Sequence, residues 1–255
     1  MRSVAKKIIG SVVYAIAVIG IALAVWAGAA AAVDSEFVLP SVQTTAREFV
    51  KIFGITDFRS GLGGTLLRSS VGFFISLGLF FATFFTSTAF PVFKCIIEPI
   101  ISALRSLPAV AVTLILSLAV GGYGTPIVLG VLVIYPIMYS AAQARTATVS
   151  AELKEICVLL GANKRQTFKA LWFPNLAGGL PDSLSSAFSY NIKAVIGAEI
   201  LAQTAESLGM LMSQAQAYLE PARLIALVIA AVIVSVSAEI ALRFALKLAL
   251  RRYAD

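Results

Sequence analysis

The stretch EICVLLGANKRQTFKALWFP, residues 155–174, interrupts a chain that otherwise consists of long apolar runs. It combines several cations with two residues that end helices, Gly161 and Pro174. About half of its residues are apolar and are spaced as on one side of a helix, which is typical of a structured segment exposed to water. The stretch is therefore expected to be a folded loop between membrane spans.

Helix signals divide this loop into two short helices. The first is expected to run from an N-cap at Ser150 to Gly161, which can end it in the left-handed conformation. Asn163 with Gln166 three residues later is a capping box that can begin the second helix, and Pro174 is expected to end it. The alternative is a solvated connector whose cations only fix the orientation of the chain in a membrane.

The composition of the whole chain places it in a lipid bilayer. Of its 255 residues, 59% are apolar and 13% are charged, and the mean hydropathy is +0.93. These values lie far outside those of soluble domains. A helix needs about 20 apolar residues to cross the hydrocarbon core. The apolar runs then predict six spans, over residues 8–33, 66–86, 92–120, 125–142, 181–202 and 222–246.

Two of these runs allow more than one interpretation. The first shares the basic start of a signal peptide, but it is too long for one, and an uncleaved span is expected. The third is interrupted by Pro99 and by RSLP at residues 105–108. It is expected to be kinked or divided, and to lie within protein rather than face lipid.

The segments between the spans carry weaker signals. Apolar residues at helical spacing in residues 42–53 predict a short helix on the surface of the membrane or the protein. GGYGTP, residues 121–126, is expected to form a tight turn with Pro126 at the first position of the fourth span. Residues 203–221 are expected to be a loop.

Lysine and arginine gather on one side of the six-span arrangement, near both ends of the chain and in the loop of residues 143–180. Positive residues mark the cytoplasmic side of membrane proteins. Both termini and the long loop are then expected to be cytoplasmic. The net charge of +7 is explained by this orientation, and binding to nucleic acid is not expected.

Several chemistries are excluded by the residues present. The chain has no histidine, and Cys95 and Cys157 lie far apart with no CxxC pattern. Histidine catalysis, a structural disulfide and a thiolate metal site are therefore not expected. The Walker A pattern GxxxxGK[ST] is also missing from the sequence, so the chain is not an ATP-binding motor. A non-enzymatic chain that binds no metal or cofactor itself is expected.

Charges inside predicted spans are candidates for a solute pathway, because they are costly unless they face the protein interior or water. Lys193 and Glu199 lie in the fifth span, where Tyr190 and Asn191 could also line a cavity. The structural alternative is that Glu199 is solvated or pairs with a neighbouring helix, and that Lys193 has a structural partner. Two pairs spaced by four residues are expected to be structural ion pairs: Glu239 with Arg243, and Lys94 with Glu98.

Residues 155–174 resemble the EAA motif in the membrane subunit of binding-protein-dependent ABC importers. That motif consists of Glu-Ala-Ala, three residues, Gly, nine residues, and Ile-x-Leu-Pro. Here Glu155, Ile156 and Cys157 occupy the triplet, Gly161 follows after three residues, and LWFP at residues 171–174 follows after nine more. Ile156 and Cys157 are bulkier than the two alanines of the motif, which bears on how the loop packs against a partner.

The resemblance extends over nearly the whole chain and is closer to the nitrate, sulfonate and taurine branch, which includes relatives for pyrimidine precursors of thiamine. The matching segments, in order, are FVLPSV at 37–42, LRSLPAVAV at 104–112, LGANKRQTF at 160–168, AEILAQTAESLGMLM at 198–212 and AEIALRFALKLALRRY at 238–253.

The resemblance implies an all-α membrane protein with six transmembrane helices in the type I (MetI-like) permease fold, as one transmembrane domain over residues 1–255. In that family two such subunits, here expected as a homodimer, form a translocation path at their interface. Each coupling loop sits in a cleft of a cytosolic ATPase that uses ATP and Mg²⁺. The coupling residues implied here are Glu155, Ile156, Cys157, Gly161, Ala162, Leu171, Phe173 and Pro174.

An external binding protein would deliver the solute to a bacterial plasma membrane, where the chain would be a multi-pass protein. The branch implies a nitrate-, sulfonate- or taurine-like solute or a thiamine-precursor pyrimidine. The alternative function is an ion-coupled secondary transporter or channel, which would use buried ionisable residues without an ATPase.

Overall fold

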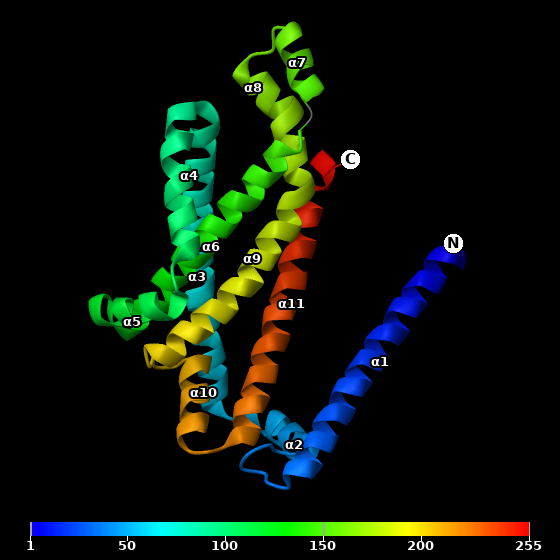
Figure 1. Ribbon diagram of the computed structural model, residues 1–255, viewed down its shortest axis with the longest axis vertical. Coiled ribbons are helices and arrows are strands. Elements are labelled where there is room, and N and C mark those ends of the chain that lie inside the picture. Colours follow the sequence, from blue (N-terminus) through cyan, green and yellow to red (C-terminus); the bar gives the residue numbers. More distant parts are fainter. Residues whose placement is uncertain (1, 150, 255) are drawn as a thin grey trace. The chain divides into compact units, whose positions relative to one another are not determined.

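A computed structural model describes residues 2–149 and 151–254. The chain divides into two compact units, Met1–Arg59 with Leu211–Ala230, and Ser60–Met210 with Ala231–Asp255. In the part of the chain that the structure describes, all regular elements are helical (Figure 1).

The first unit contains α1 (Arg2–Val33) and α2 (Val42–Ile52). The side chain of Ser41 caps α2 by accepting a 3.2 Å hydrogen bond from the backbone N–H of Thr44. The Trp26 indole of α1 donates a 3.1 Å hydrogen bond to the Pro40 carbonyl, which ties the two helices together. The predicted short helix over residues 42–53 is confirmed, with Ile52 buried and Val50 exposed.

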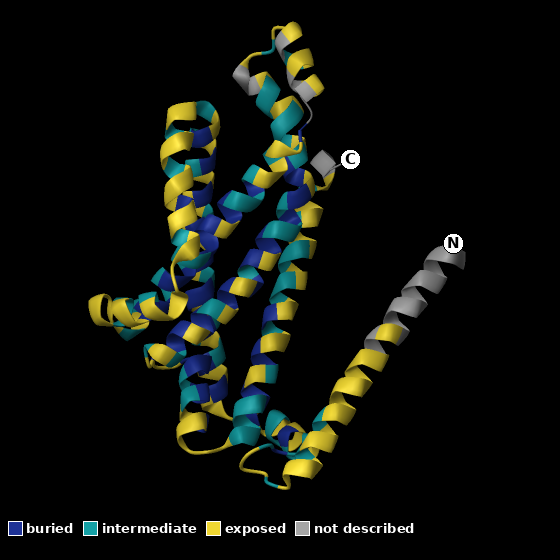
Figure 2. Ribbon diagram, viewed as in Figure 1, coloured by how far each residue is buried: buried dark blue, intermediate teal, exposed yellow. Residues whose placement is uncertain are grey.

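The second unit holds most of the remaining helices. In chain order these are α3 (Thr56–Ala89), α4 (Pro91–Ser106), α5 (Ala109–Ala119), α6 (Gly121–Ala147), α7 (Ala151–Leu159), α8 (Lys164–Thr167), a π-helical turn (Phe168–Trp172), α9 (Phe173–Leu201), α10 (Leu208–Ala217) and α11 (Pro221–Ala254). Helices α3, α10 and α11 each have residues in both units. Helices α6 and α9 pack side by side, and buried residues follow both of them (Figure 2).

The core of the second unit is aromatic. Phe73, Phe80 and Phe84 project from α3 at helical spacing and are buried against α6 and α9. Tyr139 of α6 is also buried there, and its hydroxyl donates a 3.0 Å hydrogen bond to the Ser87 hydroxyl of α3. The Phe73 ring also packs edge-to-face on Phe188 of α9, with ring centres 5.0 Å apart. Close packing of this kind holds membrane helices together, so this cluster fixes the frame on which the candidate sites are built.

The third hydrophobic region is divided, as predicted, but the break lies only at RSLP. Helices α4 and α5 meet at 96° across Leu107 and Pro108. Leu107 is extended, with ψ of 130°, because a following proline disfavours the helical conformation. Pro99 lies inside α4 without breaking it. Leu107 and Val110 are exposed in the single chain, and the expectation that the break lies within protein rather than facing lipid stays a prediction.

The predicted tight turn over residues 121–126 is wrong. Helix α6 begins at Gly121, whose φ of +79° reverses the chain after α5, and Pro126 lies inside the helix instead of at its start. Pro126 has no N–H for the carbonyl of Gly122 four residues earlier. That carbonyl instead accepts a 2.7 Å hydrogen bond from the Thr204 hydroxyl, and this distant partner lets the helix continue.

Two further boundaries differ from the sequence-based expectation. The fifth long helix begins at Phe173 rather than at residue 181, because it is continuous with the π-helical turn. The expected loop of residues 203–221 contains α10, so that expectation is wrong for its central part.

Length and hydropathy identify three helices in the described residues that could cross a membrane: Thr56–Ala89, Gly121–Ala147 and Pro221–Arg251. The bent pair α4 and α5 would make a fourth span. Ala17–Val33 in α1 is a shorter apolar stretch, and α9 carries more polar residues. The all-α membrane fold is therefore confirmed, and the number of six spans stays a prediction.

Candidate functional site

The most exposed candidate site is a projection made of α7, the turn at Gly161 and α8, residues 151–167, which we call the α7–α8 projection (Figure 1). Gly161 has φ of +67°, and the N–H of Ala162 donates a 2.9 Å hydrogen bond to the Cys157 carbonyl. This is the Schellman pattern that a glycine after a helix forms. The predicted stop at Gly161 is confirmed, while the predicted N-cap Ser150 lies outside the described residues.

The predicted capping box at the start of α8 is also confirmed. The Asn163 N–H donates to the Gln166 side chain at 2.8 Å, and the Gln166 N–H donates to the Asn163 side chain at 2.9 Å. Two free N–H groups at the helix start are thereby satisfied without any partner protein. The projection is therefore a defined turn between two helices, as predicted, and its contact with a partner stays a prediction.

Apolar side chains are exposed on this projection. Leu159 and Leu160 are 84% and 79% exposed, and Ile156 is 49% exposed. Glu155 and Gly161 are exposed as well, whereas Cys157 and Ala162 are half-buried. An exposed patch of large aliphatic residues on a charged segment is typical of a surface that another protein covers.

The projection passes into α9 without a break. In the π-helical turn the N–H of Phe173 bonds to the Phe168 carbonyl five residues earlier, so the hydrogen bonds are already displaced where Pro174 occurs. This displacement accommodates the proline, and the prediction that Pro174 ends the second helix is wrong. Leu171 and Phe173 are half-buried and Pro174 is exposed. A movement of the projection would therefore reach α9 directly.

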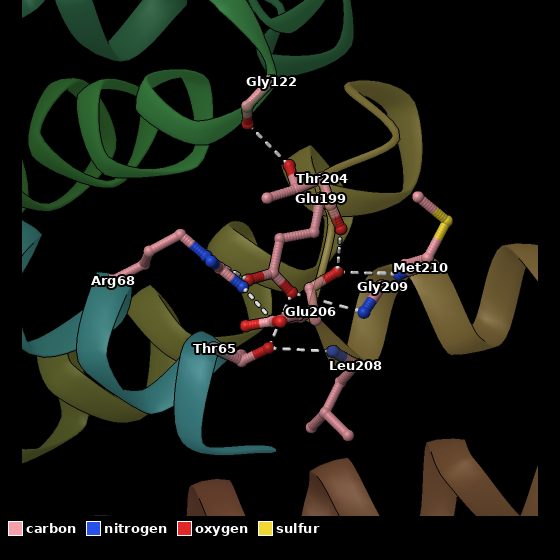
Figure 3. A network of polar contacts seen from close by, with 10 residues as sticks. Thr65, Arg68, Gly122, Glu199, Thr204, Glu206, Leu208, Gly209 and Met210 are labelled. Atoms are coloured by element: carbon pink, nitrogen blue, oxygen red, sulfur yellow. Dashed lines mark hydrogen bonds and ion pairs between the residues drawn. The ribbon is translucent and has the colours of Figure 1, made fainter. Parts of the chain in front are cut away.

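The charge at Glu199 is buried and paired (Figure 3). Its carboxylate accepts hydrogen bonds from Arg68 Nε at 2.9 Å, from the Thr65 hydroxyl at 2.8 Å and from the Gly209 N–H at 3.3 Å. The Glu199 and Arg68 side chains are 0% and 3% exposed. The alternative that Glu199 pairs with a neighbouring helix is confirmed, since Arg68 belongs to α3, and its role in a pathway stays a prediction.

We call these contacts, with the backbone of residues 206–209, the Glu199 clasp. Arg68 Nη2 donates to the Glu206 carbonyl at 2.8 Å, and the Leu208 N–H donates to the Thr65 hydroxyl at 3.0 Å (Figure 3). Arg68 also lies over the Tyr123 ring, 5.5 Å from its centre. The clasp therefore joins α3, α6 and α9 to the start of α10.

Arg68 was not singled out from the sequence, although a signal was present. It lies near the start of the predicted second span, where an arginine is as costly as Glu199 is in the fifth. Opposite charges at the same end of two spans are expected to pair, because each offsets part of the desolvation cost of the other.

Asn191 lies at a crossing of three helices. It is buried, its amide nitrogen donates to the Ser69 carbonyl at 2.6 Å, and a Cβ added to Gly130 would lie 2.5 Å from its Oδ1. Gly72 of α3 approaches it from another side. The structure therefore gives Asn191 a packing environment, away from the surface on which Lys193 and Tyr190 lie.

Lys193 and Tyr190 are exposed on one side of α9 and line a common groove of about 260 Å³. The other walls come from α5, including Val110 and Thr113, and from α6, including Leu129. These are the two sequence-predicted pathway residues that the structure brings together.

The other predicted ion pairs are confirmed. Arg243 Nη2 lies 2.7 Å from Glu239 Oε1, and Lys94 Nζ lies 3.5 Å from Glu98 Oε1. Arg243 also lies 3.3 Å from Asp182 of α9. The Glu239–Arg243 pair therefore belongs to a contact between α9 and α11 rather than to α11 alone.

This helical arrangement is that of a MetI-like permease. The chain is similar to a crystal structure of an amino acid ABC transporter with histidines, with a TM-score of 0.63 and 15% sequence identity over 80% of this chain and 98% of that one. At this identity the likeness shows the fold.

Residues 74–254 match the model of a family described as the binding-protein-dependent transport system inner membrane component. The match covers well over half of the chain, and the protein belongs to this family. No curated protein was found to match the sequence. A component of this kind is embedded in the membrane and works with an ATPase and a substrate-binding protein.

Proposed function

We propose that this chain is the non-catalytic membrane subunit of an ATP-driven importer, which forms the translocation path for a small solute. The observation that carries the proposal is the α7–α8 projection, a folded turn with exposed Leu159 and Leu160 at the position of the EAA-like spacing. Exposed aliphatic residues on a charged segment favour a protein partner over solvent. The partner proposed here is a cytosolic ATPase, which would bind ATP and Mg²⁺.

The projection has the properties of a lever. Gly161 sets a fixed angle between α7 and α8, and the capping box makes α8 begin at one position. Because α8 continues through the π-helical turn into α9, a displacement at Glu155 or Ile156 would be transmitted to the helix that carries Lys193. Leu171, Phe173 and Pro174 would then lie at the junction through which the motion passes.

The finer features of the proposal rest on the sequence resemblance. They are a homodimer in a bacterial inner membrane, both termini in the cytoplasm, one transmembrane domain over the whole chain, and a solute of the nitrate, sulfonate or taurine type or a thiamine-precursor pyrimidine. The importer is favoured over an ion-coupled transporter by membership of a binding-protein-dependent family.

The test is a comparison of two substitutions at Gly161. A Cβ added at this position meets no neighbour within 4 Å, so the first atom of a new side chain is accommodated and the φ of +67° is the local constraint. Asparagine adopts this conformation readily, whereas other residues pay about 1–2 kcal/mol. Gly161→Asn is expected to keep the ATPase bound during purification, and Gly161→Arg is expected to release it and to abolish uptake. Equal retention of the ATPase and normal uptake in both variants would overturn the proposal.

A further inference from the structure

The groove beside Lys193 contains the one charge of α9 that has no ion-pair partner in the described part of the chain. Asp182 lies 3.3 Å from Arg243 and 3.2 Å from Lys247, and Glu199 is held by Arg68. Lys193 forms no ion pair with any described residue and is exposed to the groove. An unpaired ammonium group within a span has to meet water or an anion.

The groove is otherwise apolar and small. Its walls are formed by side chains such as Val110 of α5 and Leu129 of α6, and its volume is about 260 Å³. This volume lies just below the roughly 300–1,000 Å³ of sites for drug-sized ligands. An apolar wall lowers the local dielectric constant and strengthens a charge pair formed beside it.

Polar donors lie on one side of the groove only. Lys193 offers three N–H donors and no acceptor, and Tyr190 lies three residues earlier on the same side of α9. Thr113, on the opposite wall, already donates its hydroxyl to the Ala109 carbonyl at 2.7 Å. Two adjacent donors against apolar walls suit an anionic group attached to a small apolar body.

We propose that this groove is a binding site for the anionic group of the solute, a small monoanion such as an alkylsulfonate, held by Lys193 with Tyr190 beside it. The proposal rests on the proposed transport function; it gives the solute a location and selects the anionic solutes among those named for that function. It disfavours an aminopyrimidine. The groove offers no carboxylate to a protonated aminopyrimidine, and a neutral one would leave the Lys193 ammonium group without an anionic partner.

Gly197 provides a way to test the site without disturbing the fold. It lines the groove one turn from Lys193, and an added Cβ meets nothing within 4 Å. Gly178 on the same helix is equally open and lies about 22 Å from Lys193 along the helix axis. Cysteine at these two positions, with Cys95 and Cys157 replaced by serine, gives a reporter in the groove and a matched control outside it.

The experiment compares the rates at which an anionic and a cationic thiol reagent modify each cysteine in the assembled transporter in nanodiscs of neutral lipid. The reagents are 2-sulfonatoethyl and 2-trimethylammonioethyl methanethiosulfonate, and the first is itself a small alkylsulfonate. We expect Lys193→Gln to lower the ratio of anionic to cationic rates at Gly197→Cys by about five- to tenfold, and to leave the ratio at Gly178→Cys unchanged. Ethanesulfonate is expected to slow the anionic reaction, while 4-amino-2-methylpyrimidine is not.

Three results would overturn the proposal. A ratio at Gly197→Cys that does not depend on Lys193 would show that another group neutralises the ammonium. Protection by the pyrimidine and not by ethanesulfonate would assign the groove to the other solute class. Slowing of the anionic reaction by anionic lipid added to the nanodiscs, with no slowing by ethanesulfonate, would assign the site to a lipid headgroup. Ala194→Cys in the same groove serves as a second reporter if the first variant does not assemble. The readout needs no transport, so it is separate from the ATPase test at Gly161.

Discussion

Replacement of Glu199 by glutamine is expected to destabilise the protein strongly, because it leaves Arg68 charged and unpaired in the interior. The amide oxygen of glutamine can still accept from the Thr65 hydroxyl and the Gly209 N–H, which now lie 2.8 and 3.3 Å from the carboxylate. The substitution therefore removes the charge and keeps the shape. Glu199 and Arg68 are both buried, so solvent cannot compensate for the loss.

The size of the expected destabilisation follows from the burial of the Glu199–Arg68 pair. Breaking a buried ion pair by removing one partner costs about 3–5 kcal/mol. At about 2–4 °C per kcal/mol for a chain of this size, the thermal midpoint is expected to fall by about 6–20 °C. The double variant Glu199→Met with Arg68→Met removes both charges and is expected to be more stable than the glutamine variant alone.

The measurement is thermal unfolding of the purified complex in nanodiscs, followed by tryptophan fluorescence. Glu239→Gln is the matched control, because its pair with Arg243 is partly exposed and contributes about 0–1 kcal/mol. A Glu199→Gln variant that unfolds within about 2 °C of the unmodified protein, together with lost uptake, would refute the reasoning. That result would instead assign Glu199 to the solute pathway.

Two further substitutions test the local structure of the two sites. Gly209→Ala would place a Cβ 2.4 Å from the Glu199 Cβ and 2.8 Å from the Ile196 carbonyl oxygen. Overpacking of this kind costs about 1–3 kcal/mol, so the thermal midpoint is expected to fall. An unchanged midpoint would contradict the packing of the Glu199 clasp. Asn163→Ala removes half of the capping box and is expected to cost the projection about 0.5–2 kcal/mol, seen as faster hydrogen exchange in residues 164–167, with Asn163→Ser as the control that keeps a cap.

Local signals in the sequence predicted the projection well because its geometry depends on neighbouring residues. Gly161 adopts the left-handed conformation after α7, and Asn163 bonds to Gln166 within the same turn. Both features depend on hydrogen bonds between residues a few positions apart, so the residue types at those positions predict them.

The prolines were harder to interpret, because their effect depends on distant partners. Pro126 is tolerated since Thr204, far along the chain, bonds to the carbonyl that the proline leaves open. Pro174 is tolerated because the π-helical turn before it displaces the hydrogen bonds. Pro99 remains inside α4. Neither a remote hydroxyl nor a π-helical turn can be read from the residues adjacent to a proline.

The partners of a buried charge, as in the Glu199 clasp, also come from distant segments and could not be predicted from neighbouring residues. Composition identified Glu199 as costly within a span, but its partner Arg68 and the N–H of Gly209 come from other segments. The difference between Glu199 and Lys193, six residues apart on α9, arises only from which neighbouring helix each one faces. Tertiary packing decides which of the two side chains is buried, whereas the helical period shows only that they lie on different sides of the helix.

The most direct test of the central claim, that the α7–α8 projection binds an ATPase, is site-specific photocrosslinking in native membranes. Benzoylphenylalanine is introduced at Leu159, which is 84% exposed on the projection, and at Leu118, which is 91% exposed on α5, as the control. A crosslink from residue 159 to an ATPase subunit that contains a Walker A motif, with none from residue 118, is the predicted result. Crosslinks from residue 159 to lipid or to other membrane proteins, with no ATPase product, would contradict the account.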